Sequence, residues 1–287
     1  MSTQEWLDRD ARVLAGVLYR YFDVVAERGQ GSWVVDAEGR RYLDLAAGIA
    51  VVNLGHCHPR VVEAIQRQAA TLIHTSIVVH NQPNVELAER LARLCPFLDE
   101  PQVFFCNSGA ESVDGVIKMA RKTTGRPGVI AFTGGFHGRT LAATSLTTAK
   151  ARYRAGYGPL LPGVYHAPYC VPRPGGRGQT AAVASALAGL DQLLAAVVAP
   201  SEVAAMVVEP VLGEGDTWCP RWPGSRACAS AATPTGSCSC STRSSAAWAA
   251  PGDSSPRRPS GWHPTPCSSP RASPPVCPWA GSSHPGV

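Results

Sequence analysis

The C-terminal part of the chain lacks the residues from which hydrophobic cores are built. Residues 217–287 contain no Leu, Ile, Met, Phe, Tyr or Lys, yet they hold 13 of the 25 prolines, six of the 10 cysteines and five of the 7 tryptophans. Such a segment buries too little aliphatic surface to offset the entropy lost on ordering its backbone. We therefore expect a disordered tail at 217–287.

The chain also lacks long apolar runs and a basic leader. No stretch of about 18 uninterrupted apolar residues is present, and the opening MSTQEWLDRD is acidic. The net charge of +5 belongs to the tail, where six arginines face one acid, Asp253, while the other 20 basic and 20 acidic residues cancel. The sequence thus predicts a soluble, cytoplasmic protein with neither a membrane partner nor a nucleic-acid partner.

Three explanations compete for the tail: a genuine disordered segment, a cysteine-rich metal or disulfide module, and a shifted reading frame. Its cysteines show no paired CxxC spacing, and disulfides conflict with a cytoplasmic front half. Written in suitable codons and regrouped by one base, residues 239–245 read Leu-Leu-Asp-Glu-Val-Gln, and residues 267–278 give a segment with Ala-Lys-Gly. We favour the hypothesis of a frameshift near 215–217.

Before the tail, the hydrophobic pattern alternates between strands and helices. Residues 30–46 turn at 37–39 and predict a β-hairpin, Pro59 begins a helix, and Asn84 is the expected cap of a helix that Pro96 stops. There follow a strand at 103–106, a helix at 109–124, a strand at 128–132, a helix at about 181–198 and a strand at 204–208. This order predicts an α/β domain with a mostly parallel sheet, helices on both faces and ligands beyond the carboxyl ends of the strands.

The segment CNSGAES at 106–112 places a helix start directly after a strand. Free N–H groups and the positive end of the helix dipole favour an anion there, and Ser108 and Gly109 permit a phosphate to approach closely. The alternative is a plain serine cap with Glu111 three residues on, a capping box. Taken alone, the motif favours the cap.

The segment TGGFHGRT at 133–140 also follows a strand. Phe136 is suited to stacking on a planar ring, and Arg139 to binding a carboxylate through two parallel hydrogen bonds. The alternative is a glycine-rich loop without a binding role, in which the phenylalanine belongs to the core and the arginine to the surface.

In VVEPVLGEG, at 207–215, a buried strand runs into Glu209, a charge that needs a partner if it is not a solvated loop acid. In GHCHP, at 55–59, two histidines precede a helix with no third ligand near them in the sequence, so a helix-entry turn explains them better than a metal site. We expect no metal.

Five segments occur in the order and spacing of one family: RGQGSWVVDAEGRRYLDLAAGIAVVNLGHCHPRVVEAI, FFCNSGAESV, TGGFHGRT, ARYRAGYGPLLPG and VVEPVLGEG. Over about residues 10–216 the chain resembles the front half of a class III pyridoxal-phosphate-dependent aminotransferase, closest to the 4-aminobutyrate and acetylornithine branch. The resemblance implies the type I fold of these enzymes, with an N-terminal segment at 1–55 and an incomplete large domain at 56–216. It also implies pyridoxal 5'-phosphate as cofactor, an amino donor and a 2-oxo acid as substrates, and a homodimer.

The resemblance assigns roles to nine residues. Ser108, Gly109 and Ala110 would hold the cofactor phosphate, Phe136 would cover the pyridine ring, His137 would lie behind it, and Glu209 would lie near cofactor and substrate. Ile49 would line the substrate pocket, Arg139 would bind a substrate carboxylate, and Glu214 would neutralise an arginine of the C-terminal domain.

Two residues of the family have no counterpart in this chain. The Schiff-base lysine carries a proton between substrate and cofactor, and an aspartate keeps the ring nitrogen protonated. Their positions are overwritten by residues 241–245 and 270–271, and we expect Lys118, Lys122 and Lys150 to be ordinary surface charges. The resemblance therefore implies a transaminase by family that is inactive as written.

Two other functions compete with this one. A non-catalytic fragment could bind pyridoxal phosphate reversibly or assemble with an intact subunit. A phosphate-binding α/β domain of another class is the third, although the chain has neither a Walker A nor a GxGxxG pattern.

Overall fold

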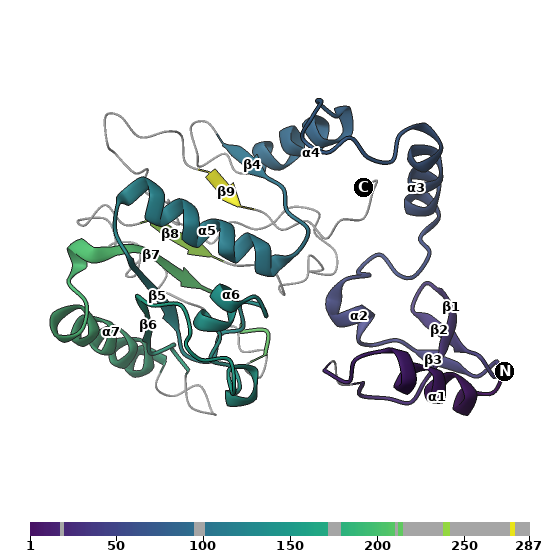
Figure 1. Cartoon of the computed structure of the whole chain (residues 1–287), viewed down its shortest axis with the longest axis horizontal. Helices are drawn as coiled ribbons and strands as arrows, with labels where there is room; N and C mark the ends of the chain where they lie inside the picture. The colour runs from purple at the N-terminus through teal and green to yellow at the C-terminus, as the bar shows by residue number, and fades with distance from the viewer. Residues whose placement is uncertain are drawn as a thin grey trace. The chain divides into compact units, whose positions relative to one another are not determined.

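The protein was analysed as a computed structural model that describes residues 1–17, 20–94, 101–171, 179–209, 212–214, 238–241 and 276–278. The chain forms two compact units (Figure 1), the first Met1–Val79 and the second the described residues from His80 onward. The first unit runs to Val79 and so includes the helix that begins at Pro59, whereas the sequence placed a boundary at residue 55. No helix within the described ranges is both long and apolar enough to cross a membrane.

The first unit is built on a small antiparallel sheet. Its strands β1 (Ala26–Gln30), β2 (Trp33–Asp36) and β3 (Arg41–Leu43) pair in sequence order. Strands β2 and β3 form the hairpin predicted for residues 30–46. The helices of this unit are α1 (Thr3–Val13), α2 (Ala47–Ala50) and α3 (Pro59–Thr71).

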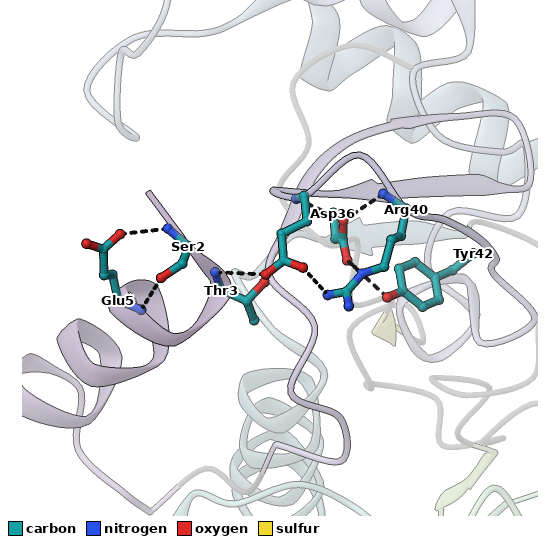
Figure 2. Close-up of polar contacts among 7 residues, drawn as sticks. Ser2, Thr3, Glu5, Asp36, Arg40 and Tyr42 are labelled. Carbon is teal, nitrogen blue, oxygen red and sulfur yellow. Dashed lines mark hydrogen bonds and ion pairs between the residues drawn. The ribbon is translucent and has the colours of Figure 1, made fainter.

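A set of polar contacts holds the hairpin turn and ties it to α1 (Figure 2). The fully buried Asp36 accepts hydrogen bonds from the backbone N–H groups of Glu38 and Arg40, from Arg40 Nε at 2.7 Å and from Tyr42 Oη at 3.0 Å. Glu38 in turn accepts from the N–H of Thr3 at 3.2 Å. Burial alone would raise the pKa of Asp36, but these hydrogen bonds, that of Arg40 foremost, outweigh it and lower the pKa to about 2.

Asp36→Asn is expected to loosen this turn, because an amide brings its own N–H donors to a site that supplies only donors. Amide hydrogen exchange at Glu38 and Arg40 should be faster in the variant than in the wild type at pH 6, with Asp23→Asn as control. The folded-state pKa lies below the ordinary value, so the wild-type stabilisation is complete above that value and is lost as the pH falls towards 2. Equal exchange rates in wild type and variant would contradict this role.

Helix α2 is a single turn of left-handed backbone. Four consecutive residues have positive φ: Ala47 at 47°, Gly48 at 63°, Ile49 at 59° and Ala50 at 60°. Left-handed helical backbone costs roughly 1–2 kcal/mol for each non-glycine residue. Asp44 holds the start of the turn, since its Oδ1 accepts from the N–H groups of Ala46 and Ala47, both at 2.9 Å.

The second unit has a parallel sheet at its centre (Figure 1). The strand order is β6 (Val164–Ala167), β5 (Gly128–Phe132), β7 (Val203–Val208) and β8 (Cys238–Ser241), all in parallel pairs. Strand β4 (Gln102–Phe104) pairs in parallel with β9 (Val276–Pro278). The helices are α4 (Gln82–Arg93), α5 (Gly109–Thr124), α6 (Leu141–Leu146) and α7 (Gln179–Ala196), with short 3-10 turns at Ala151–Tyr153 and Pro200–Glu202.

The core shows that helices cover both faces of this sheet. Every residue of β5 is buried. Ile130 and Phe132 pack in a cluster with Leu190 of α7, whereas Val129 and Ala131 pack in a second cluster with residues of α5 and α6. Because successive strand residues point to opposite faces, α7 covers one face and α5 with α6 the other. The predicted α/β fold with a parallel sheet is confirmed.

The sequence predicted where helix α4 begins and ends. The structure tests only its start. The predicted cap at Asn84 is wrong, because Asn81 caps α4 and its side chain accepts from the N–H of Asn84. Pro83, which has no N–H to lose, occupies the first turn. The predicted stop at Pro96 and most of the tail at 217–287 lie outside the described residues; the described parts of the tail are β8 and β9.

Candidate functional site

The N-terminus of α5 has both the serine cap and the free amides of an anion site, the two alternatives that the sequence left open. Ser108 caps the helix, its Oγ accepting from the N–H of Glu111 at 3.2 Å, and the Glu111 carboxylate accepts from the N–H of Asn107 at 2.7 Å. The N–H groups of Gly109 and Ala110 donate to no described residue. The serine cap is therefore real, and it leaves two amides at the positive end of a 16-residue helix available to an anion.

The loop after β5 lies directly on this helix start. Gly138, with φ of 124°, approaches so closely that a Cβ there would lie 2.6 Å from the Cβ of Ala110. Thr140 Oγ1 donates to Asp114 of α5 at 2.9 Å. The motifs at 106–112 and 133–140 are thus one structure.

His137 is a buried imidazole without partners among the described residues. Its side chain is 3% exposed in the folded chain, and neither Nδ1 nor Nε2 makes a hydrogen bond there. Its backbone is held by an N–H bond to Thr147 Oγ1 at 2.9 Å. Burial, and then the nearby His166, lower the pKa of His137 to about 4, so the ring is neutral at pH 7.

Glu209 joins the ends of β5 and β7. It is 3% exposed, and its two carboxylate oxygens accept from the backbone N–H groups of Phe136 at 2.5 Å and Gly213 at 2.9 Å. Burial raises the pKa of Glu209 against the lowering effect of these two bonds. The partner expected for this buried charge is therefore a pair of main-chain amides.

Tyr153 is a member of the site that the sequence reasoning missed. Its ring meets that of Phe136 edge to face, with centroids 5.3 Å apart, and its hydroxyl donates to Glu214 at 3.1 Å. Glu214 also pairs with Lys150 Nζ at 3.0 Å. The only sequence signal was its place in ARYRAGYGPLLPG, where nothing singles out one tyrosine.

The remaining expected residues fall in different places. Arg139 is exposed, with its guanidinium carbon 5.7 Å from the centroid of the Tyr153 ring. Lys118 and Lys122 are exposed as predicted, but the expectation for Lys150 is incomplete, because it forms the ion pair with Glu214. Ile49 belongs to the first unit, where it is 79% exposed on the left-handed turn.

His56 has an acidic neighbour that its sequence context concealed. Its Nε2 lies 2.6 Å from Oδ2 of Asp44, the residue that also holds α2. No group of three or more candidate ligand residues that could hold a metal ion occurs in the described part of the chain.

The family model for class-III aminotransferases matches residues 16–221. The chain belongs to this family. It is 39% identical over 218 residues to a probable 4-aminobutyrate aminotransferase of Bacillus subtilis (strain 168), covering 75% of this chain and 50% of the relative. It is 45% identical over 202 residues to an acetylornithine aminotransferase of Methanopyrus kandleri, covering 70% and 46%. The class III chain thus spans about half the length of the curated relatives it matches.

Solved transaminase structures share the fold. A taurine:2-oxoglutarate aminotransferase from Bifidobacterium kashiwanohense, in complex with PLP and glutamate, superposes with a TM-score of 0.75 at 25% identity, covering 84% of this chain and 55% of that one. An (S)-enantioselective omega-transaminase from Thermomicrobium roseum gives 0.72 at 30% identity, covering 84% and 56%. The type I fold of pyridoxal-phosphate-dependent transferases, incomplete in this chain, is confirmed, and its cofactor is pyridoxal 5'-phosphate.

The described residues of this class III chain fit part of that cofactor. Two unpaired amides at the start of α5 suit a phosphate. The neutral His137 has no described hydrogen-bond partner. It lies so close to Gly135 that a Cβ on Gly135 would come within 2.8 Å of His137 Nε2. That the lysine and the ring-nitrogen aspartate of the family have no counterpart stays a prediction from the resemblance. The described residues therefore suit the phosphate of the cofactor.

Proposed function

We propose that this chain is the cofactor-binding half of a transaminase that moves an amino group from an ω-amino acid, such as 4-aminobutyrate, to a 2-oxo acid, such as 2-oxoglutarate. As written, it binds pyridoxal phosphate reversibly and does not turn over. The names of its relatives, which include 4-aminobutyrate, acetylornithine and 5-aminovalerate aminotransferases, support a substrate with an amino group distant from a carboxylate.

One observation carries the proposal: four segments far apart in the sequence meet at the carboxyl ends of β5 and β7. Gly138 packs on Ala110, Glu209 binds the amides of Phe136 and Gly213, and Tyr153 joins Phe136 to Glu214. Ligands of parallel α/β sheets bind at such ends.

The residues would divide the binding of the cofactor among them. Gly109 and Ala110 would donate backbone hydrogen bonds to the phosphate, with Ser108 completing the turn. Phe136 would cover the pyridine ring and His137 would lie behind it as a neutral group. Arg139 would take a substrate carboxylate through its guanidinium.

Bound pyridoxal phosphate supplies an aldehyde that reacts with amines and a ring that withdraws electrons. What this chain cannot supply is the proton carrier beside the substrate carbon, because Lys118 and Lys122 lie on the exposed side of α5 and Lys150 is paired with Glu214. We therefore propose that the chain binds pyridoxal phosphate but does not catalyse transamination.

A shifted reading frame after about residue 215 would account for the missing lysine. The proposal is supported by two separate stretches, residues 239–245 and 267–278, whose codons regrouped by the same shift can read as family motifs in family order. Sequencing the genomic DNA from the codon of Val207 past that of Val287 tests it. One base gained or lost near Gly215 would support the shift, and an unbroken frame would refute it.

A homodimer is the proposed assembly, and it is supported by the first unit. Asp36 is the only residue classed as buried among the described residues of this unit, so it has no apolar core of its own. Large apolar side chains are exposed instead, among them Leu45, Ile73, Ile77 and Val78. Sedimentation equilibrium should give twice the chain mass; a monomer at micromolar concentration would refute the dimer.

Ser108→Asp separates a phosphate site from a plain helix cap. Aspartate caps helices as well as serine does, so α5 should keep its stability, but the added charge repels a phosphate at the same place. We expect the affinity for pyridoxal phosphate, measured by fluorescence titration, to fall at least tenfold, or about 1.4 kcal/mol.

The control is Ser108→Thr, which keeps the cap and adds no charge. It should bind within about twofold of the wild type, a change of under 1 kcal/mol. If the aspartate variant binds as tightly as the wild type, Ser108 is a cap and the phosphate lies elsewhere.

A further inference from the structure

Glu214 is held by two donors from the segment that precedes β6. Lys150 Nζ lies 3.0 Å and the Tyr153 hydroxyl 3.1 Å from the same carboxylate oxygen. The ion pair is half-buried, with side chains 43% and 32% exposed for Lys150 and Glu214. Each contact joins residues more than sixty positions apart in the sequence, so the tertiary structure brings them together.

Both partners are charged at neutral pH. Burial favours the neutral acid, but hydrogen bonds from Lys150 and Tyr153 outweigh it and lower the pKa of Glu214. The hydrogen bond to Glu214 is in turn the main reason that the pKa of Lys150 is raised. A charged pair of this kind neutralises Glu214 towards other cations.

Arg139 lies beside Tyr153, the tyrosine whose hydroxyl binds this acid. Its guanidinium carbon is 5.7 Å from the centroid of the Tyr153 ring, and its charge also lowers the pKa of Glu214. Yet Arg139 forms no ion pair with any residue that the structure describes. Three cations therefore lie beside the Tyr153 ring, namely Arg139, Lys150 and Arg152, and Lys150 is the one that pairs with Glu214.

We propose that Lys150 and Tyr153 are positioning residues that hold Glu214 away from Arg139 and so keep Arg139 available to an incoming carboxylate. The proposal rests on the proposed function for the role of Arg139, and it adds two residues that decide whether that role can be exercised. Without Lys150, Glu214 turns to Arg139 and neutralises it. The consequence is weaker binding of substrates that carry a carboxylate.

Binding of glutarate, an unreactive dicarboxylate, measures the consequence in the full chain loaded with pyridoxal phosphate. Lys150→Met should weaken it about tenfold. Adding Glu214→Gln should restore most of the loss, whereas Glu214→Gln alone should change binding less than about twofold. If Lys150 acted only by attracting anions at a distance, Glu214→Gln would strengthen binding equally in both backgrounds, and that result would overturn the proposal.

Carboxyl ¹³C NMR titration of Glu214 in the cofactor-free chain tests the exchange of partners directly. In Lys150→Met the pKa of Glu214 should stay below its ordinary value, because Arg139 replaces Lys150; in Lys150→Met with Arg139→Met it should rise above the wild-type value. Arg154→Met, a nearby loss of charge, should leave it unchanged. If Lys150→Met alone raises the pKa as far as the double variant does, Glu214 does not turn to Arg139 and the proposal fails. This titration needs no ligand, so it remains decisive even if pyridoxal phosphate does not bind.

Discussion

Gly138→Ala is expected to lower the free energy of unfolding of the second unit by about 3 kcal/mol and to abolish cofactor binding. A Cβ at this position would lie 2.6 Å from Ala110 Cβ and 2.9 Å from its Cα, so the loop must move off the start of α5. Overpacking costs about 1–3 kcal/mol, and a non-glycine residue at the φ of 124° adds about 1–3 kcal/mol. Urea unfolding and fluorescence titration with pyridoxal phosphate measure the two effects.

Gly156→Ala is the matched control, because it separates backbone strain from the steric clash. Gly156 also has a positive φ, 81°, but nothing lies within 4 Å of its would-be Cβ. We expect a cost of about 1 kcal/mol and unchanged cofactor binding. Equal effects of the two substitutions would mean that contact between Gly138 and Ala110 is not what holds the site together.

The stability of the second unit should fall steeply below pH 6.5, and His137 should be the main cause. The pKa of its imidazole drops from 6.5 to about 4 on folding, because the ring is buried beside His166. Between these two pKa values His137 is protonated in the unfolded chain and neutral in the folded chain, so the stability of the fold decreases as the pH falls. This difference in pKa corresponds to a loss of about 3 kcal/mol in the free energy of unfolding, and the loss is complete near pH 4.

Replacing the imidazole by an apolar group removes this dependence. Neither ring nitrogen has a described partner, so His137→Leu gives up no hydrogen bond and should be about as stable as the wild type at pH 7. At pH 4.5 the variant should be the more stable protein in urea unfolding. Parallel pH profiles for the two proteins would show that His137 titrates normally.

The sequence was informative where one local pattern dominates. Five consecutive apolar residues at 128–132 predicted a buried strand, and all five are buried. The helix predicted at about 109–124 spans Gly109–Thr124 in the structure, where Ser108 caps its start and Gly125, in left-handed conformation at φ of 70°, follows its end. Elements of this kind carry their own start and stop signals.

Contacts between distant segments could not be predicted in the same way. Glu209 needed a partner, but nothing in the sequence identified the amides of Phe136 and Gly213 as that partner. Lys150 looked like a surface charge because its acid lies 64 residues away. Such pairs are fixed by the sheet order, which brings the loops after β5 and β7 together.

The left-handed turn at α2 was hidden for a different reason. Glycine is the usual signal for positive φ, and the segment 46–50 has only Gly48. The turn depends on Asp44, which binds the N–H groups of Ala46 and Ala47, and on His56, which contacts Asp44 from twelve residues away. Strain of this kind persists only where the surrounding structure holds it.

Parallel titration of the full chain with pyridoxal 5'-phosphate and with its alcohol analogue, pyridoxine 5'-phosphate, tests the central claim most directly. If the chain holds the phosphate and ring but lacks the lysine that bonds to the aldehyde, the two compounds should bind with Kd values within about threefold of each other, a difference of under 1 kcal/mol. They should also displace one another, and Ser108→Asp should weaken both. Much tighter binding of the aldehyde, fixed by borohydride to a single lysine, would contradict the account, as would failure of both compounds to bind.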